Sequence, residues 1–233
     1  MATTGTYAFM PSAGDIVLAA FSMIGVRRAK ITQEHLEDAA FWANMVGVDI
    51  TNRQPNLWKA GSAPFALTAG VSTYDLPLQT VAVLPPIVTV AGIDRPLAPI
   101  SQADYNAIPY KTQPGPPTSY LFTLARQPTI TVWPVPTAAP AMSMSVDIYQ
   151  QQEDTALAGD ASVDVVYRFL EAYTLGLAAR LAAGWADGTL SERLAAAGTL
   201  NDAYEAKFKL ASAQEQERVP LRMQPVLSSY FPR

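Results

Sequence analysis

Apolar residues recur at helical spacing at both ends of the chain, whereas they alternate with polar residues in its middle. A first helix is predicted to begin at Ser12, which forms a capping-box pattern with Asp15, and to end at Gly25. A second helix is predicted from Thr32 to a break before Pro55. The N-terminal part is therefore expected to be helical.

Two more helices are predicted near the C-terminus. Ser162 is expected to cap a helix whose apolar stripe extends to Trp185. After a turn, Thr189 and Glu192 form a capping-box pattern that begins a long alanine-rich helix reaching about Glu217. Four amphipathic helices, paired by short turns, predict a helical bundle.

The middle of the chain has the two-residue period of β-strands. Hairpins are predicted over residues 65–76, 87–100 and 120–133, and a short helical turn over residues 101–108. Residues 142–149 alternate strictly, so one face of this strand is expected to be buried. The apolar members of that strand are Met142, Met144, Val146 and Ile148.

Proline and charge divide the chain into parts. Residues 60–150 contain 14 of the 19 prolines but only 7 of the 36 charged side chains. We therefore predict an α+β protein in which the helical segments 1–59 and 151–217 form a four-helix bundle. Residues 60–150 are expected to form an antiparallel β-sheet or β-sandwich module between them, followed by an extended docking tail at 218–233.

Composition excludes several classes of protein. The 233 residues are 49% hydrophobic, which is enough for a sizeable core, and they carry a formal charge of -4. Without a basic field, a protein that grips nucleic acid or anionic lipid is not expected. The chain has no cysteine, which rules out disulfides and thiolate chemistry. The longest uncharged stretch, 127–146, contains four prolines, so no membrane-spanning helix is expected.

Candidate catalytic residues are few. His35 is the only histidine, and we expect it to be an exposed helix residue because no nucleophile motif accompanies it. Glu34, Glu37 and Asp38 could act as acid and base on a glycan, but carboxylates in a first helical turn are also what the helix dipole favours. No cofactor or metal site is predicted.

Two surface clusters each allow two interpretations. Arg27, Arg28 and Lys30 lie between the first two helices, where they could contact phosphate or an acidic partner or simply form a solvated turn. Tyr120, Phe122 and Trp133 could be a platform for stacking sugars, or they could pack in a core or an interface.

The order of the segments resembles that of a known family. The motif residues are Phe65, Leu67, Gly70, Tyr74, Leu76, Pro77, then Lys111, Gly115, Pro116, Tyr120, and finally Trp133-Pro134-Val135-Pro136. Together with the helix, strand, helix order, they resemble the head-to-tail connector or adaptor proteins of short-tailed bacteriophages, the group that includes tail tubular protein A and the tail accessory factor that closes the portal. The resemblance covers roughly residues 12–210.

This resemblance implies a structural role without an enzymatic step. The protein would be made in the host cytoplasm and form a dodecameric ring at the head-tail interface of the virion. Its partners would be the portal protein, the tail nozzle protein and copies of itself. Genomic DNA would pass through the lumen without tight binding, and the charge of -4 per subunit agrees with a conduit that does not hold its cargo. The alternatives are a virion-associated cell-wall-degrading enzyme and a carbohydrate-binding module.

Two segments are predicted to bind partners. The rigid loop Gln113-Pro114-Gly115-Pro116-Pro117 is expected to contact a neighbouring subunit or the nozzle. The tail is basic and apolar and has three prolines, so we expect it to dock in extended form on the portal, or else on the next subunit, rather than to lie across its own helices. Its expected contact residues are Arg218, Leu221, Arg222, Met223, Val226, Leu227, Tyr230 and Phe231.

Overall fold

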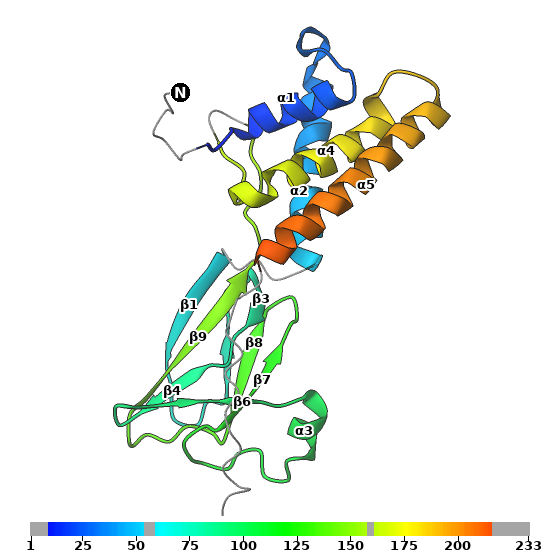
Figure 1. Ribbon diagram of the computed structural model, residues 1–233. Coiled ribbons are helices and arrows are strands. Elements are labelled where there is room, and N and C mark those ends of the chain that lie inside the picture. The colour runs from blue at the N-terminus through cyan, green and yellow to red at the C-terminus, as the bar shows by residue number, and fades with distance from the viewer. Residues whose placement is uncertain (1–8, 54–58, 158–160, 216–233) are drawn as a thin grey trace, which may run out of the picture.

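The computed structural model describes residues 9–53, 59–157 and 161–215. Within these residues the protein is α+β, with helices gathered at one end and strands at the other (Figure 1). The α-helices are α1 (Ala13–Met23), α2 (Gln33–Arg53), α3 (Gln102–Ala107), α4 (Leu170–Trp185) and α5 (Leu190–Glu215), with one-turn 3-10 helices η1 (Arg28–Lys30) and η3 (Tyr167–Phe169). The strands are β1 (Ala60–Ala66), β2 (Thr73–Asp75), β3 (Thr80–Val83), β4 (Ile87–Val90), β5 (Ile93–Pro96), β6 (Ala98–Pro99), β7 (Ser119–Thr123), β8 (Thr129–Trp133) and β9 (Met142–Gln150).

Helix α4 is the centre of the helical part. Helices α1, α2 and α5 each pack against it, and α2 crosses the other three steeply (Figure 1). Their shared core includes Phe21, Tyr173, Leu177 and Tyr204, each at most 1% exposed. Only α4 and α5 form the expected pair joined by a short turn, because α1 and α2 pack mainly against α4.

The predicted ends of α1 are confirmed. Ser12 and Asp15 form both hydrogen bonds of a capping box. At the other end, the Gly25 N–H donates to the Ser22 carbonyl and the Val26 N–H to the Phe21 carbonyl, which is the Schellman pattern. The glycine is required there because its φ is +85°.

The predicted start of the third long helix is wrong. Ser162 does not cap a helix but forms an antiparallel bridge with Ser12, next to a hydrogen bond of 2.7 Å from the Ala13 N–H to the Ala161 carbonyl. The helix instead begins with η3 and continues as α4 from Leu170. Residues 163 and 165 are both buried valines, and an extended backbone brings both to the core, which explains the delayed start.

Two sheets make up the β part. The first has the order β1-β9-β4-β5, with β3 also paired to β9, and the second has the order β2-β8-β7-β6. All pairs are antiparallel except β6 with β7. Buried residues of both sheets belong to one apolar cluster. The predicted face of β9 is confirmed, because Met142, Met144, Val146 and Ile148 are all buried.

The hairpin predictions have different outcomes. The pairing of β7 with β8 confirms the hairpin over 120–133. The hairpin over 65–76 is wrong, because β1 pairs with β9 and β2 pairs with β8, in different sheets. A real turn does lie between them, held by hydrogen bonds from the Tyr74 hydroxyl to the Val71 carbonyl and from the Thr68 N–H to the Tyr74 hydroxyl. That turn carries the chain from one sheet to the other.

The hairpin over 87–100 is confirmed only in its first strand, because residues 93–96, expected in the loop, pair with β4, whereas residues 98–99, expected in the second strand, leave this sheet. Strands β4 and β5 are joined by Ala91 and Gly92, whose φ angles of 50° and 79° fit a two-residue primed turn. The next residues, β6, join the second sheet beside β7. Helix α3 has the predicted capping box between Ser101 and Asp104. No helix among the described residues is long and apolar enough to cross a membrane.

Candidate partner-binding surfaces

The histidine lies in an aromatic stack. His35 is half-buried, with its ring centroid 3.8 Å from that of Trp185 and 5.4 Å from that of Phe21. Its Nδ1 atom lies 2.7 Å from the Thr32 hydroxyl. The expectation of an exposed His35 was therefore wrong, because three helices meet around this side chain. Its contacts tie the start of α2 to α1 and α4.

Two of the three nearby carboxylates have hydrogen-bond partners. Glu34 and Glu37 are exposed, and Glu37 accepts a hydrogen bond from the Gln33 amide. Asp38 accepts a hydrogen bond of 2.9 Å from the indole N–H of Trp185. In the described part of the chain, no three His, Cys, Asp or Glu residues are grouped so as to hold a metal ion.

The three aromatic candidates do not form one platform. Tyr120 is opposite Val132 and Phe122 is opposite Ile130, so these two rings lie on the buried face of their sheet. Trp133 follows Val132 and points to the other face, where it is half-buried and donates its indole N–H to the Tyr110 carbonyl. The sugar-stacking interpretation therefore loses its geometric basis.

The loop 113–117 is fastened to the segment after β8. The Gly115 N–H donates to the Val135 carbonyl at 2.9 Å, and the Val135 N–H donates to the Gln113 carbonyl at 2.8 Å. A side chain on Gly115 would contact the Pro134 ring at 3.4 Å. Gln113, Pro114 and Pro116 remain exposed while Pro117 is buried. The loop is thus a rigid, uncharged projection whose backbone is already paired.

The link between α1 and α2 presents the basic cluster to solvent. Arg27, Arg28 and Lys30 are all exposed, on and beside η1. Their exposure fits both a solvated turn and a contact with a partner, so the choice between the two stays a prediction. Asp15 lines the same shallow hollow as Arg27 and Arg28, so positive and negative charges lie side by side on this surface.

An apolar groove between α1 and the start of α4 was not predicted from the sequence. It has a volume of about 900 Å³. Phe9, Met23 and Tyr167 line it and are 79%, 49% and 72% exposed. Exposed apolar side chains gathered in one hollow are typical of interaction sites. Its walls come from segments more than 140 residues apart, and no local pattern in the sequence reveals that they meet.

A model of the SU10 adaptor protein family matches residues 19–225 of the chain. The chain belongs to this family. The resemblance to bacteriophage adaptors is thereby confirmed, while the restriction to short-tailed phages stays a prediction. As an SU10 adaptor protein, the molecule is a structural component of a phage virion. No curated protein matches the chain significantly.

The family match reaches into the predicted docking tail. Its candidate contacts, Arg218 to Phe231, lie outside the described residues, and so does the predicted end of the last helix near Glu217.

The predicted start of α5 is confirmed, since the Thr189 N–H donates to the Glu192 carboxylate at 2.7 Å and the Glu192 N–H donates back to the Thr189 hydroxyl.

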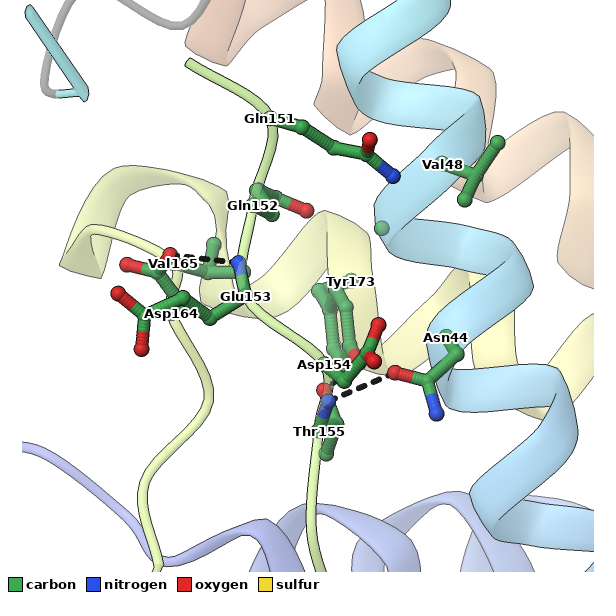
Figure 2. Close-up of a pocket in the computed structure, with 11 residues that line it drawn as sticks. Asn44, Val48, Gln151, Gln152, Glu153, Asp154, Thr155, Asp164, Val165 and Tyr173 are labelled. Carbon is green, nitrogen blue, oxygen red and sulfur yellow. Dashed lines mark hydrogen bonds between the residues drawn. The ribbon is translucent and has the colours of Figure 1, made fainter. Parts of the chain in front are cut away.

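The helical and β parts of this SU10 adaptor protein are joined through a hydrogen-bonded junction. Figure 2 shows the segment after β9 passing between α2 and the stretch before η3. The Glu153 N–H donates to Asp164 at 2.9 Å, and the Thr155 N–H donates to the Asn44 side-chain carbonyl at 2.7 Å (Figure 2). The Tyr173 hydroxyl donates to the Ala43 carbonyl at 2.9 Å. The first two bonds hold the segment after β9 against α2 and the stretch before η3, and the third joins α4 to α2.

The cavity at this junction has no room for a substrate. It has a volume of about 10 Å³, which is enough for one water molecule. Gln152, 9% exposed, has an amide nitrogen without a hydrogen-bond partner among the described residues, so a water molecule would satisfy it. Lys59 closes the junction with ion pairs to Asp164 (2.7 Å) and Glu153 (3.2 Å). Burial lowers the pKa of Lys59, but hydrogen bonds to these two carboxylates outweigh burial and raise it.

A second polar network joins α2, α4 and α5. Asp49 accepts hydrogen bonds from the Tyr204 hydroxyl at 2.7 Å and from Arg180 at 3.2 Å, and it pairs with Arg53 at 3.1 Å. Arg53 also reaches Glu205 at 2.7 Å. Burial raises the pKa of Asp49, but the Tyr204 and Arg53 hydrogen bonds and the two arginine charges outweigh burial and lower it. The arrangement fixes three helices and leaves no reactive group free within it.

Proposed function

We propose that this protein is the head-to-tail adaptor of a short-tailed phage and forms a dodecameric ring between the portal protein and the tail nozzle protein. The match to the SU10 adaptor protein family over residues 19–225 carries this proposal. The ring, its stoichiometry and its two partners go beyond the match and are inferred from the resemblance and from the surfaces of the molecule.

The surfaces of the β part support contacts with other chains. Leu78 and Leu124 are 68% and 62% exposed and line one groove of about 330 Å³ at the foot of α2. At another edge, Ile93 is 59% exposed. Residues 60–150 hold only 7 of the 36 charged side chains, and charged residues are depleted from the cores of interfaces. We assign these surfaces and the loop 113–117 to contacts with neighbouring subunits or the nozzle.

The charge supports a passive conduit. A protein that neutralises DNA phosphates with many Lys or Arg contacts binds DNA tightly at low salt. This chain has 16 basic against 20 acidic residues, and the basic cluster at 27–30 shares its surface with Asp15. We infer that DNA passes through the lumen of the ring without being held.

We also propose a division of labour along the chain. The helical segments 1–59 and 151–217 form one unit, the β module 60–150 forms a second, and the tail 218–233 docks on another chain of the assembly. The four helices share one core and the two sheets share another, which supports this division. The junction at Lys59 and Gln152 is the place where the two units meet.

The decisive experiment is cryo-electron microscopy of the purified protein mixed with the portal protein from the same phage. We expect twelve copies arranged as a ring on one end of the portal, with the loop 113–117 at a subunit boundary or facing the nozzle. A protein that stays unattached to the portal would contradict the adaptor role. A ring with another number of subunits would refute only the stoichiometry.

A peptidoglycan-lysis assay separates this function from that of a cell-wall-degrading enzyme. We expect no lysis by the wild-type protein. Lysis that disappears in the Glu34→Gln and Glu37→Gln variants would show that these carboxylates are catalytic and would contradict the purely structural role.

A further inference from the structure

The groove between α1 and α4 has the chemistry of a docking site. Ala19 and Met23 line it from α1, Leu170 and Thr174 line it from α4, and Phe9 and Tyr167 extend it. Only two of its described lining residues are charged, and both are acids, Asp15 and Glu171. A partner should therefore be apolar with a few positive charges.

One segment of this chain has those properties. Residues 218–233 contain three arginines and no acid, together with seven large apolar side chains. Pro220, Pro225 and Pro232 favour an extended backbone, which lets alternate side chains enter a groove. The 16 residues span at most about 55 Å when fully extended.

We propose that residues 218–233 of a second copy of this chain occupy the groove between α1 and α4. The proposal rests on the ring described under the proposed function, and it makes each tail a link to the next subunit rather than to the portal. Asp15 would face a tail arginine beside the ion pair of Glu171 with Lys207, while Met23, Leu170 and Tyr167 would receive the apolar side chains of the tail.

The direction of α5 favours a second copy over the same chain. Helix α5 approaches the groove lining at Lys207, which forms an ion pair of 2.7 Å with Glu171. It then continues to Glu215, and its C-terminal end points toward the side of the helical part where the strands lie (Figure 1). To enter its own groove the tail would have to reverse direction.

The absence of cysteine from the chain permits a direct cross-linking test. One protein carries Ala19→Cys in the groove. A second, distinguished by a size tag, carries a cysteine at Val219, Val226 or Tyr230, each in turn. The two proteins are mixed with and without the portal protein and oxidised, and the products are separated without reducing agent. We expect a cross-linked heterodimer for at least one tail position.

Matched variants test whether the cross-link reports docking. In the first control, Gly198→Cys replaces Ala19→Cys in the groove protein. Gly198 lies on the exposed side of α5 with open space around it, so this cysteine should give no heterodimer. Met23→Lys, placed beside Ala19→Cys, puts a cation into the groove and should abolish the product. Phe41→Lys, on the exposed side of α2, should leave the yield of the cross-linked product unchanged. Met23 and Phe41 are 49% and 58% exposed, so neither change should unfold the protein.

The other outcomes separate a failure of the tail docking from a failure of the adaptor function. A chain with both cysteines that yields only an internally linked monomer, with no heterodimer in the mixture, would place the tail in its own groove. In that case deleting residues 219–233 should also lower the Tm of the monomer, whereas we expect no change. If rings form on the portal but no tail position reaches Ala19→Cys, the tail docks elsewhere and the adaptor function stands. A heterodimer in a protein that never binds the portal would instead refute the adaptor function alone.

Discussion

Replacing Gly176 by alanine is expected to destabilise the helical part, although alanine is the better helix former. Gly176 lies in the middle of α4, where α2 and α5 both approach it. A Cβ atom there would lie 3.2 Å from two ring carbons of Tyr204 and 3.3 Å from Val46. Carbon atoms in favourable contact are about 3.5–4.0 Å apart, so both neighbours would have to move.

Neither neighbour can move freely. Tyr204 and Val46 are fully buried, and the Tyr204 hydroxyl is held by Asp49 at 2.7 Å. Overpacking of this kind costs about 1–3 kcal/mol. The change from glycine to alanine in a helix interior returns about 0.8–1 kcal/mol. The free energy of unfolding should therefore fall by up to about 2 kcal/mol, which lowers the Tm by roughly 2–4 °C for each kcal/mol in a chain of this size.

Gly198→Ala is the matched control. Gly198 lies within α5, where an added Cβ would have no atom within 4 Å. This variant makes the same change of helix propensity without overpacking, so it should be stabilised by up to about 1 kcal/mol. Urea titration followed by circular dichroism measures both variants against the wild type. A Gly176→Ala variant as stable as Gly198→Ala would refute the close packing inferred around Gly176.

Three further predictions follow from the same residues and surfaces. The pKa of Asp49 is lowered in the folded state, so its contribution to stability is present at neutral pH and is lost as the pH falls through that lowered value. Between about pH 7 and pH 3 the Tm of the Asp49→Asn variant should therefore fall less than that of the wild type. An equal fall would contradict the network around Asp49. The free protein should not shift duplex DNA in a gel at physiological salt. Tight, salt-sensitive binding that disappears when Arg27, Arg28 and Lys30 are changed to Glu would overturn the conduit model. The backbone amides of Gln113 and Gly115, the two N–H groups of the loop 113–117, should exchange hydrogen more slowly in the assembled ring than in the free protein. Equal rates would remove the loop from the interface.

Local features of the fold followed from the sequence because the interactions that produce them lie within a few residues. The capping boxes at Ser12 and Thr189 join side chains three residues apart, so their pattern is visible in the sequence and each helix begins where predicted. The buried face of β9 was equally predictable, because alternation over residues 142–149 leaves one side of the strand for the core. The hairpin of β7 and β8 needed only a short connection.

Features that depend on distant segments required the tertiary structure. The turn near Gly70 reads as a hairpin, yet β1 finds a better partner in β9, about eighty residues away, and no local signal reports that choice. Ser162 reads as a helix cap, but Val163 and Val165 enter the core only from an extended backbone that pairs with Ser12.

The candidate sites divide in the same way. The loop 113–117 was recognisable as a rigid, uncharged projection, because proline stiffness is a property of the residues themselves. The half-buried position of His35 and the groove between α1 and α4 were not recognisable, since each is formed where helices from opposite ends of the chain pack together. The sequence by itself thus determined the capped helix starts and the apolar face of β9. Only the tertiary structure decided which faces meet and which stay open to a partner, because packing depends on contacts between residues that are neighbours in space but not along the chain.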